Sequence, residues 1–196
     1  MRLALFDFDG TLTTRDSLMP FLRHVVGTPR FVAGLAATSL PLLSYALGYL
    51  RNDVAKQRVI GHFLGGRERA EVEAAGREFA RRHLPAMLRA STLAALRQHQ
   101  EAGDTCVLVS ASLDVYVQPW ADAQGLSAVL CSGLEVNAQQ RVTGRIQPAN
   151  CYGPEKARRI QEWLAGRRPS HITAWGDSRG DAEMFALADT VHQVRG

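Results

Sequence analysis

Short apolar runs that suit strands alternate with longer helical patterns along this chain, and this alternation limits the possible folds more than any other feature. We expect strands at residues 3–8, 106–110, 128–131, 172–175 and 190–194. Helical periodicity covers roughly residues 68–100, 115–124, 154–165 and 181–187. Strands separated by helices predict a parallel sheet with right-handed crossovers. The expected fold class is therefore α/β, with a Rossmann-like parallel sheet as its core.

Two stretches depart from simple alternation. Residues 134–146, "LEVNAQQRVTGRI", are expected to form a hairpin closed by residues 137–140. About ninety residues separate the first strand from the second, far more than one crossover helix needs. We therefore predict an inserted helical cap over residues 17–79, and an α/β core made of residues 1–16 and 80–196.

The expected cap contains a stretch without any charged residue. Residues 31–50, "FVAGLAATSLPLLSYALGYL", lie between Arg30 and Arg51. A run of about 20 apolar residues is long enough to cross a bilayer. Small and polar residues dilute this run, however, and Pro41 should divide it into two short helices. Two buried cap helices are the favoured interpretation, contact with a membrane surface is the second, and a full span is the third.

Composition narrows the class of protein. The chain has 196 residues, of which 46% are hydrophobic, enough for one core and a modest insertion. The net charge is +4, but the 23 Lys and Arg residues form no long run, so nucleic acid is not an expected partner. Three cysteines without CxxC spacing favour a reduced compartment, and the early acids exclude a cleavable secretory segment. We expect a cytoplasmic protein, with a peripheral place at the inner membrane as the alternative.

Two acids, Asp7 and Asp9, follow the first apolar run directly. In an open parallel sheet, ligands bind beyond the carboxyl ends of the strands, and side chains two residues apart on an extended chain point the same way. Two close carboxylates are costly without a cation, and Mg²⁺ is the ion that oxygen ligands of this kind prefer. The alternative is a pair of turn aspartates around Asp-Gly.

A second acid pair lies near the other end of the chain. In "AWGDSRGD", Asp177 and Asp181 follow the expected fourth strand. If a helix begins near Ser178, Asp177 can point at the first acid pair while Asp181 supports it from the first turn. An ordinary helix cap would explain Asp181 but would leave Asp177 without a role. Carboxylates at the ends of two strands therefore predict a metal site.

Ser110 and Lys156 are candidate phosphate ligands. Ser110 ends the second strand in "VLVSAS", where its hydroxyl and the backbone N–H groups of a following helix could hold a phosphate. Lys156 lies in the first turn of a helix that begins at Pro154, where a cation opposes the helix dipole. Taken singly, Ser110 could be only a helix cap and Lys156 only a solvated charge.

Together these residues resemble the four motifs of the haloacid dehalogenase (HAD) superfamily, in order and over the whole chain. The motifs are similar to "DFDGT" at residues 7–11, Ser110, Lys156 and "GDSRGD" at residues 176–181. The helical insertion resembles the type C1 cap, and the hairpin resembles that of the phosphoserine-phosphatase-like branch. The resemblance implies a Mg²⁺-dependent phosphomonoester hydrolase that works through an aspartyl phosphate.

The resemblance also implies a role for each motif residue. Asp7 would be the nucleophile, and Asp9 would be the general acid and base. Asp7, Asp177 and the backbone carbonyl of Asp9 would hold Mg²⁺, and Asp181 would position Asp177 or a metal-bound water. The phosphoryl oxygens would be held by Thr11, Ser110 and Lys156.

Substrate choice is expected to depend on the cap. Asp16 and Arg58 resemble the residues with which phosphoserine phosphatases hold the amino and carboxylate groups of their substrate. The chain departs from that pattern, because Asp16 replaces a glutamate, "SAS" replaces a serine followed by glycines, and Gly180 replaces an asparagine. Asp16 could equally cap the first cap helix, and Arg58 could lie on a solvated helix face.

Other members of the same branch offer different substrates. The uncharged cap segment and "CYGPEK" are similar to bacterial phosphatidylglycerophosphatase C, which implies a lipid headgroup phosphate as substrate. A soluble metabolite such as histidinol phosphate is an equal alternative. A catalytically inactive phosphate-binding protein, or a membrane-surface interaction module, would use the same fold without turnover.

Overall fold

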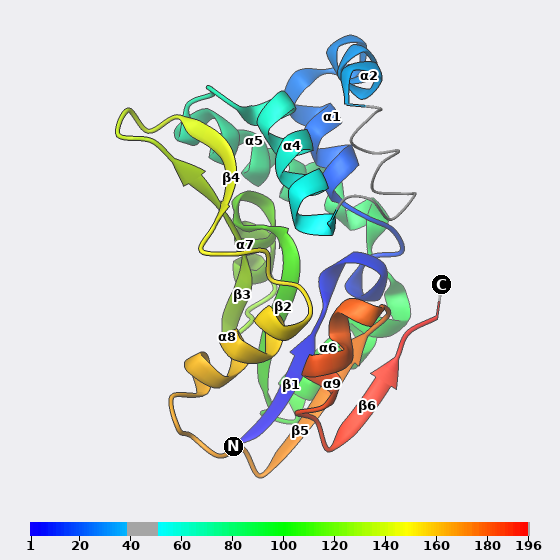
Figure 1. The fold of residues 1–196 in the computed structure, drawn as a ribbon. Helices are drawn as coiled ribbons and strands as arrows, with labels where there is room; N and C mark the ends of the chain where they lie inside the picture. Colours follow the sequence, from blue (N-terminus) through cyan, green and yellow to red (C-terminus); the bar gives the residue numbers. More distant parts are fainter. Residues whose placement is uncertain (39–50, 196) are drawn as a thin grey trace.

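The computed structural model describes residues 1–38 and 51–195, which form a sheet flanked by helices and covered at one end by further helices (Figure 1). The sheet has six strands in the order β4-β3-β2-β1-β5-β6. Their bounds are β1 Arg2–Phe6, β2 Thr105–Leu113, β3 Ala128–Val136, β4 Val142–Gln147, β5 His171–Gly176 and β6 Thr190–Gln193. All neighbours pair in parallel except β3 and β4, which are antiparallel. The predicted α/β fold class is confirmed.

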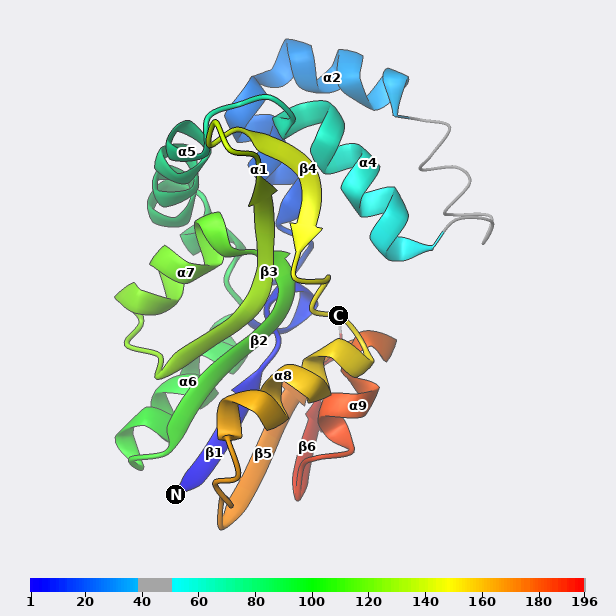
Figure 2. The same ribbon diagram turned by 60° about the vertical axis from the view of Figure 1, so that its left-hand side comes forward.

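The two faces of the sheet carry separate hydrophobic clusters, because side chains alternate along each strand. On one face, Leu3 and Leu5 pack with Ile160 of helix α8 (Pro154–Leu164) and Met184 of helix α9 (Ala182–Phe185). On the other face lie helices α6 (Ala90–Glu101) and α7 (Asp114–Ala123), as Figure 2 shows. The sheet is therefore buried on both sides, and its strand ends are left as the place for a site.

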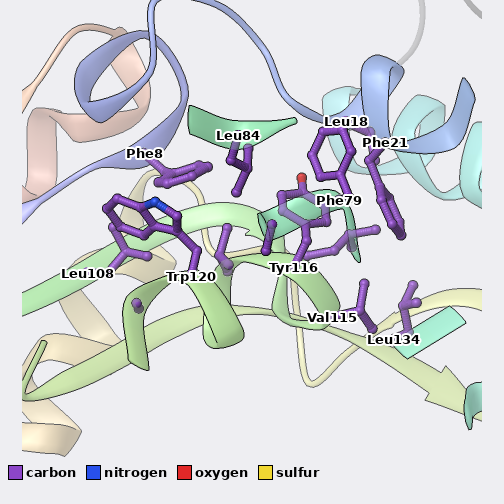
Figure 3. Close-up of a cluster of buried hydrophobic side chains, with 14 of the residues drawn as sticks. Phe8, Leu18, Phe21, Phe79, Leu84, Leu108, Val115, Tyr116, Trp120 and Leu134 are labelled. Atoms are coloured by element: carbon purple, nitrogen blue, oxygen red, sulfur yellow. The ribbon is translucent and has the colours of Figure 1, made fainter. Parts of the chain in front are cut away.

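The covering helices stand over the carboxyl ends of β1 and β2. They are α1 Leu18–Val26, α2 Thr28–Ala37, α4 Asn52–Leu64 and α5 Arg69–Arg82. Phe21 of α1 and Phe79 of α5 pack on Tyr116 of α7, with ring centroids 4.8 and 5.5 Å from that of Tyr116 (Figure 3). The cap helices thus share one hydrophobic cluster with the core. The division into a cap at 17–79 and a core around it stays a prediction.

The hairpin also contacts the cap. Gly61 of α4 and Gly144 of β4 approach so closely that a Cβ on Gly144 would lie 2.4 Å from the Cα of Gly61. Gly144 also has φ +90, a conformation that favours glycine. Helix α4 therefore rests directly on the backbone of the predicted hairpin, which the structure confirms at residues 134–147.

Several element boundaries differ from the sequence-based expectation, among them the end of β2, which lies at Leu113 rather than at residue 110. The helical region expected at 68–100 is two helices, because Pro85 lies in a short turn of helix at Leu84–Met87 and Leu88 bridges to Thr13. The strand expected at 128–131 runs on into the hairpin as β3. The first strand ends at Phe6, because the chain turns into a single helical turn at Phe8–Leu12.

The uncharged segment is described only in part. Residues 31–37 belong to α2, whereas the expected break at Pro41 lies outside the described residues. Among residues 1–38 and 51–195, no helix has both the length and the apolar character needed to cross a membrane.

Candidate active site

Asp7 and Asp177 meet because they follow adjacent parallel strands. Phe6 of β1 is in register with Trp175 of β5, and the Asp7 N–H donates to the Trp175 carbonyl at 2.9 Å. Carboxylate oxygens of Asp7, Asp177 and Asp181 all lie within 4.8 Å of one another. Three hard oxygen donors this close together fit a divalent cation such as Mg²⁺.

Gly10 allows this close approach. Its φ is +81, and a Cβ at this position would lie 2.2 Å from Oδ2 of Asp177. An L-residue side chain would therefore be strained by its backbone and would also displace the carboxylate. The glycine of "DFDGT" lets the loop after β1 reach the loop after β5.

Lys156 links two of the three carboxylates. Its Nζ donates to Oδ1 of Asp7 at 2.6 Å and to Oδ1 of Asp181 at 2.5 Å, and the residue is 2% exposed. Burial acts to lower the pKa of Lys156, but the two carboxylates outweigh it and raise that pKa above its ordinary value. Burial raises the pKa of Asp7 to about 6, although Lys156 opposes the change.

Asp181 is held by a full set of donors. Besides Lys156, its Oδ2 accepts hydrogen bonds from the Asp177 N–H at 3.1 Å and the Ser178 N–H at 3.0 Å. Ser178 caps the following turn, as the sequence predicts for a helix start near this residue. With both oxygens occupied, Asp181 fixes the backbone of Asp177 and the position of Lys156.

Asp9 points away from this carboxylate cluster. Its Oδ1 accepts from the Ser17 N–H at 2.9 Å, and its Oδ2 accepts from the Ser112 hydroxyl at 2.5 Å. Burial and the negative charge of Asp16 raise the pKa of Asp9 to about 7. Its carboxyl group therefore changes protonation close to neutral pH.

Thr11 contacts Asp7, and Ser110 lines the same cavity as Asp7. The Thr11 hydroxyl donates to Oδ2 of Asp7 at 3.3 Å, and both residues are buried. Ser110 lies within β2 rather than at its end, because the strand continues to Leu113. Its hydroxyl accepts from the Ser112 N–H at 3.0 Å, and the next helix, α7, begins only at Asp114.

A cavity of about 260 Å³ opens beside these residues. We call its core side the floor, which comprises Asp7, Asp9, Ser110, Ala111, Ser112, Tyr152, Lys156, Ser178 and Gly180. We call its cap side the roof, which comprises Asp16, Leu18, Met19, Ala55, Lys56 and Val59. The floor thus brings together residues from all four motifs, and the roof comes from the start of α1 and one face of α4.

Of the two residues predicted to contact substrate from the cap, Asp16 lines the cavity and Arg58 does not. Asp16 lines the cavity, but its Oδ1 accepts from the backbone N–H groups of Leu18 and Met19, so it also caps α1. Arg58 is exposed and lines a separate hollow beside Gly144 of the hairpin. This placement argues against a contact between Arg58 and a substrate in the cavity.

Sequence reasoning missed two polar residues of the cavity, Lys56 and Ser112. Lys56 lies on α4 between Ala55 and Val59, two buried residues four positions apart. Arg58 is two residues further along and so lies about 200° around the helix from Lys56. Within "AKQRV", Lys56 and Arg58 flank the buried pair by about 80° on opposite sides, so this stretch alone does not choose between them. The buried residues in the second half of α4 lie on the Lys56 side, so the phase of the whole helix would have favoured Lys56. For Ser112 the sequence carried no signal, because the strand was expected to end before it.

Tyr152 accounts for one departure from the HAD pattern. A Cβ on Gly180 would lie 2.4 Å from the ring of Tyr152. The tyrosine ring therefore fills the space that a larger side chain at position 180 would need. Any larger residue at position 180 would have to displace the ring of Tyr152.

Comparisons with known proteins agree with this geometry. The family model for haloacid dehalogenase-like hydrolases matches residues 4–186. The chain belongs to this family. This HAD-like hydrolase is 34% identical to protein CicA of Caulobacter vibrioides over 187 residues. The aligned region covers 95% of this chain and 83% of CicA.

Solved structures share the fold of this HAD-like hydrolase. A Bordetella pertussis protein of unknown function has a TM-score of 0.84 at 26% identity, with 97% of this chain and 88% of that chain covered. A substrate-bound phosphoserine phosphatase has a TM-score of 0.68 at 16% identity, with 96% and 83% covered. The phosphoserine-phosphatase-like form of the HAD fold is therefore present here.

Proposed function

We propose that this protein is a phosphatase that hydrolyses phosphomonoesters through an aspartyl phosphate on Asp7, with Mg²⁺ as its cofactor. One observation carries the proposal: Asp7 directly follows the central strand β1, accepts a hydrogen bond from Lys156 and lies close to the carboxylates of Asp177 and Asp181. A nucleophile beside a lysine and a carboxylate cluster suits attack on a dianionic phosphoryl group.

In the first step, an oxygen of Asp7 forms a bond to phosphorus while the bond from phosphorus to the leaving oxygen breaks. Asp9 lies next to Asp7 on the floor of the same cavity, and it gives its proton to the departing alkoxide. In the second step, Asp9 takes a proton from water as the water oxygen attacks phosphorus. The bond between phosphorus and Asp7 then breaks, so inorganic phosphate leaves and both carboxyl groups return to their starting state.

Other residues hold and orient these groups. Lys156 offsets the charge of the phosphoryl oxygens, and the hydroxyls of Ser110 and Thr11 donate to them. Ser112 and the Ser17 N–H fix the rotamer of Asp9. Asp181 keeps Lys156 and Asp177 in place. Asp7, Asp177 and the backbone carbonyl of Asp9 would hold Mg²⁺, which neutralises phosphoryl charge when it is bound.

The test is phosphate release from a panel of esters by wild type, Asp7→Asn and Asp9→Asn, with Mg²⁺ and with chelator. We expect release that needs both Mg²⁺ and Asp7, and a phosphorylated protein in acid-quenched wild-type samples by mass spectrometry. Asp122→Asn is the matched control, because Asp122 is exposed on α7 and lies outside the cavity. If folded wild type releases no phosphate from any ester, the proposal fails and a phosphate-binding protein without turnover becomes the better interpretation.

The substrate is proposed to be a small phosphorylated metabolite, because the described cavity is only about 260 Å³. A lipid headgroup phosphate is the second candidate, favoured by helix α2, where Val32 is 60% exposed beside exposed alanines. Sedimentation with vesicles of anionic and of neutral lipid separates the two candidates. Protein that stays in the supernatant with both vesicle types, and prefers soluble esters, would rule out the lipid.

A further inference from the structure

Lys56 is a cation in the roof whose contacts are uncharged. Its Nζ donates to the Ala111 carbonyl at 2.5 Å and to Oδ1 of Asn150 at 3.2 Å. Within the part of the chain that the structure describes, no carboxylate forms an ion pair with it. Burial lowers the pKa of Lys56, while Asp9 and Asp16 act in the opposite direction. Lys56 is half-buried, and a charge in that position whose hydrogen bonds go to neutral oxygens is stabilised when an anion joins it.

The second lysine of the cavity cannot serve the same purpose. Lys156 is already committed to Asp7 and Asp181 at 2.6 and 2.5 Å. In the proposed reaction it faces the transferred phosphoryl group. Of the two lysines that line the cavity in the described residues, Lys56 is therefore the one available for another anionic group.

The position of Lys56 assigns that group to the leaving-group side. Lys56 bonds the carbonyl of Ala111, and the next residue, Ser112, bonds the carboxyl group of Asp9. In the proposed mechanism, Asp9 protonates the leaving oxygen. The remaining roof residues next to Lys56 are mostly apolar, namely Leu18, Met19, Ala55 and Val59. Asp16 is the one acid of the roof, and its Oδ1 accepts from the backbone N–H groups of Leu18 and Met19. A leaving group beside Asp9 would thus meet one cation, Lys56, in a wall that is otherwise apolar except for Asp16.

Resting on the proposed phosphatase function, we propose that Lys56 binds a second acidic group on the leaving group of the substrate. The preferred substrates are then short phosphomonoesters that also carry a carboxylate or a second phosphate. A charge-assisted hydrogen bond to such a group forms with Lys56 and not with a neutral alcohol of the same size.

The test compares matched esters. The acidic esters are phosphoglycolate and 1,3-propanediol bisphosphate, and the neutral ones are ethyl phosphate and propyl phosphate. We expect wild type to favour an acidic ester in kcat/KM, and Lys56→Met to lower that value by about 10- to 100-fold while changing the neutral esters by less than about threefold. Lys56→Arg should restore part of the preference. Whichever acidic ester has the higher kcat/KM identifies the second group: a carboxylate for phosphoglycolate, a phosphate for 1,3-propanediol bisphosphate.

Arg58→Met is the control, because Arg58 is on the same helix but exposed outside the cavity. It should leave both classes of ester unchanged. An equal loss for acidic and neutral esters in Lys56→Met would overturn the inference, since it would make Lys56 only a clamp between α4 and the core. A wild type without preference for acidic esters would overturn it as well.

A binding experiment separates this inference from the proposed function. Asp7→Asn, alone and combined with Lys56→Met, is titrated with phosphoglycolate and with ethyl phosphate by calorimetry. Tighter binding of phosphoglycolate that is lost with Lys56→Met supports the inference even if wild type hydrolyses no ester. Equal binding of the two esters by Asp7→Asn counts against the inference even if hydrolysis is observed.

Discussion

The floor and the roof of the cavity hold one lysine each, and the two lysines are held in opposite ways. Lys156 on the floor lies between two carboxylates and is almost fully buried, whereas Lys56 in the roof contacts two neutral oxygens. On the floor, the groups proposed for the reaction are thus also the groups that neutralise one another. In the roof, most side chains are apolar and none is tied to a carboxylate cluster. On the floor, a substitution that removes a charged group should therefore lower both stability and activity. In the roof, side chains can change with the substrate at little cost in stability.

Lys156→Met tests this difference most strongly. It leaves Asp7 and Asp181 buried without their cation, so we expect the free energy of unfolding to fall by about 3–5 kcal/mol, together with loss of phosphate release. Lys56→Met should lower it by less than about 1.5 kcal/mol, because the loss of its hydrogen bonds is partly offset by removal of a half-buried charge. Urea denaturation of both variants measures the two values. Equal losses of unfolding free energy in the two variants would show that the floor lysine contributes no more to stability than the roof lysine.

Gly10→Ala tests the approach of the two floor loops. The backbone strain at φ +81 and the contact with Asp177 should together lower the free energy of unfolding by about 1–3 kcal/mol and reduce phosphate release. Gly103→Ala is the control, because Gly103 has φ +76 and no atom of the described residues within 4 Å of the place that a Cβ would take. Any effect of Gly10→Ala beyond that of Gly103→Ala reports the displaced carboxylate. Identical effects on stability and activity would refute a special role for Gly10.

The fold and most of the floor could be predicted because both depend on local patterns. Apolar runs predicted the strands, and a parallel sheet necessarily brings the carboxyl ends of neighbouring strands together. Asp7 and Asp177 are therefore adjacent, as "DFDGT" and "GDSRGD" suggested. Their chemical roles remain a proposal, because proximity alone does not establish turnover.

The roof was harder to predict than the floor, because it depends on the phase of a whole helix and on packing between distant segments. The choice of Lys56 over Arg58 follows from which face of α4 rests on the hairpin at Gly61 and Gly144. The length of β2 likewise decides whether Ser112 can reach Asp9. The interruption at Pro85 is the one boundary error that a stricter use of the sequence would have avoided.

Met19→Ala addresses the roof itself. Met19 is half-buried and lines the cavity from α1, so its truncation should remove apolar contact with the leaving group. We expect KM to rise by about threefold to tenfold with kcat nearly unchanged, and the free energy of unfolding to fall by about 1 kcal/mol. Steady-state kinetics on the preferred ester measure this. A fall in kcat with constant KM would instead connect Met19 to the reaction on the floor.

Glu155→Gln should have the smallest effect. Hydrogen bonds from Arg158, and further ones from Arg159, lower the pKa of Glu155 to about 2 from its ordinary 4.5, against a smaller effect of burial. A lowered pKa contributes stability that is present above pH 4.5 and lost as the pH falls toward 2. Arg158 is exposed, so its pair with Glu155 is screened by solvent, and the buried Arg159 keeps its hydrogen bonds to the Cys131 and Ala149 carbonyls. We therefore expect Gln to cost less than about 1 kcal/mol at pH 7. Urea denaturation across pH measures the difference, and a difference that persists at pH 2 would contradict this origin.

The central place of β1 in the sheet has a consequence for how the molecule assembles. Leu3 pairs with Thr105 on one side and with Ile172 on the other, so β1 is synthesised long before either of the strands that pair with it. Contacts this distant along the chain form slowly, since long loops must close first. Asp7 therefore leaves the ribosome early but meets Asp177 only after β5 has been made. Nascent chains that stop short of residue 177 should fold without a reaction centre, however well their helices form.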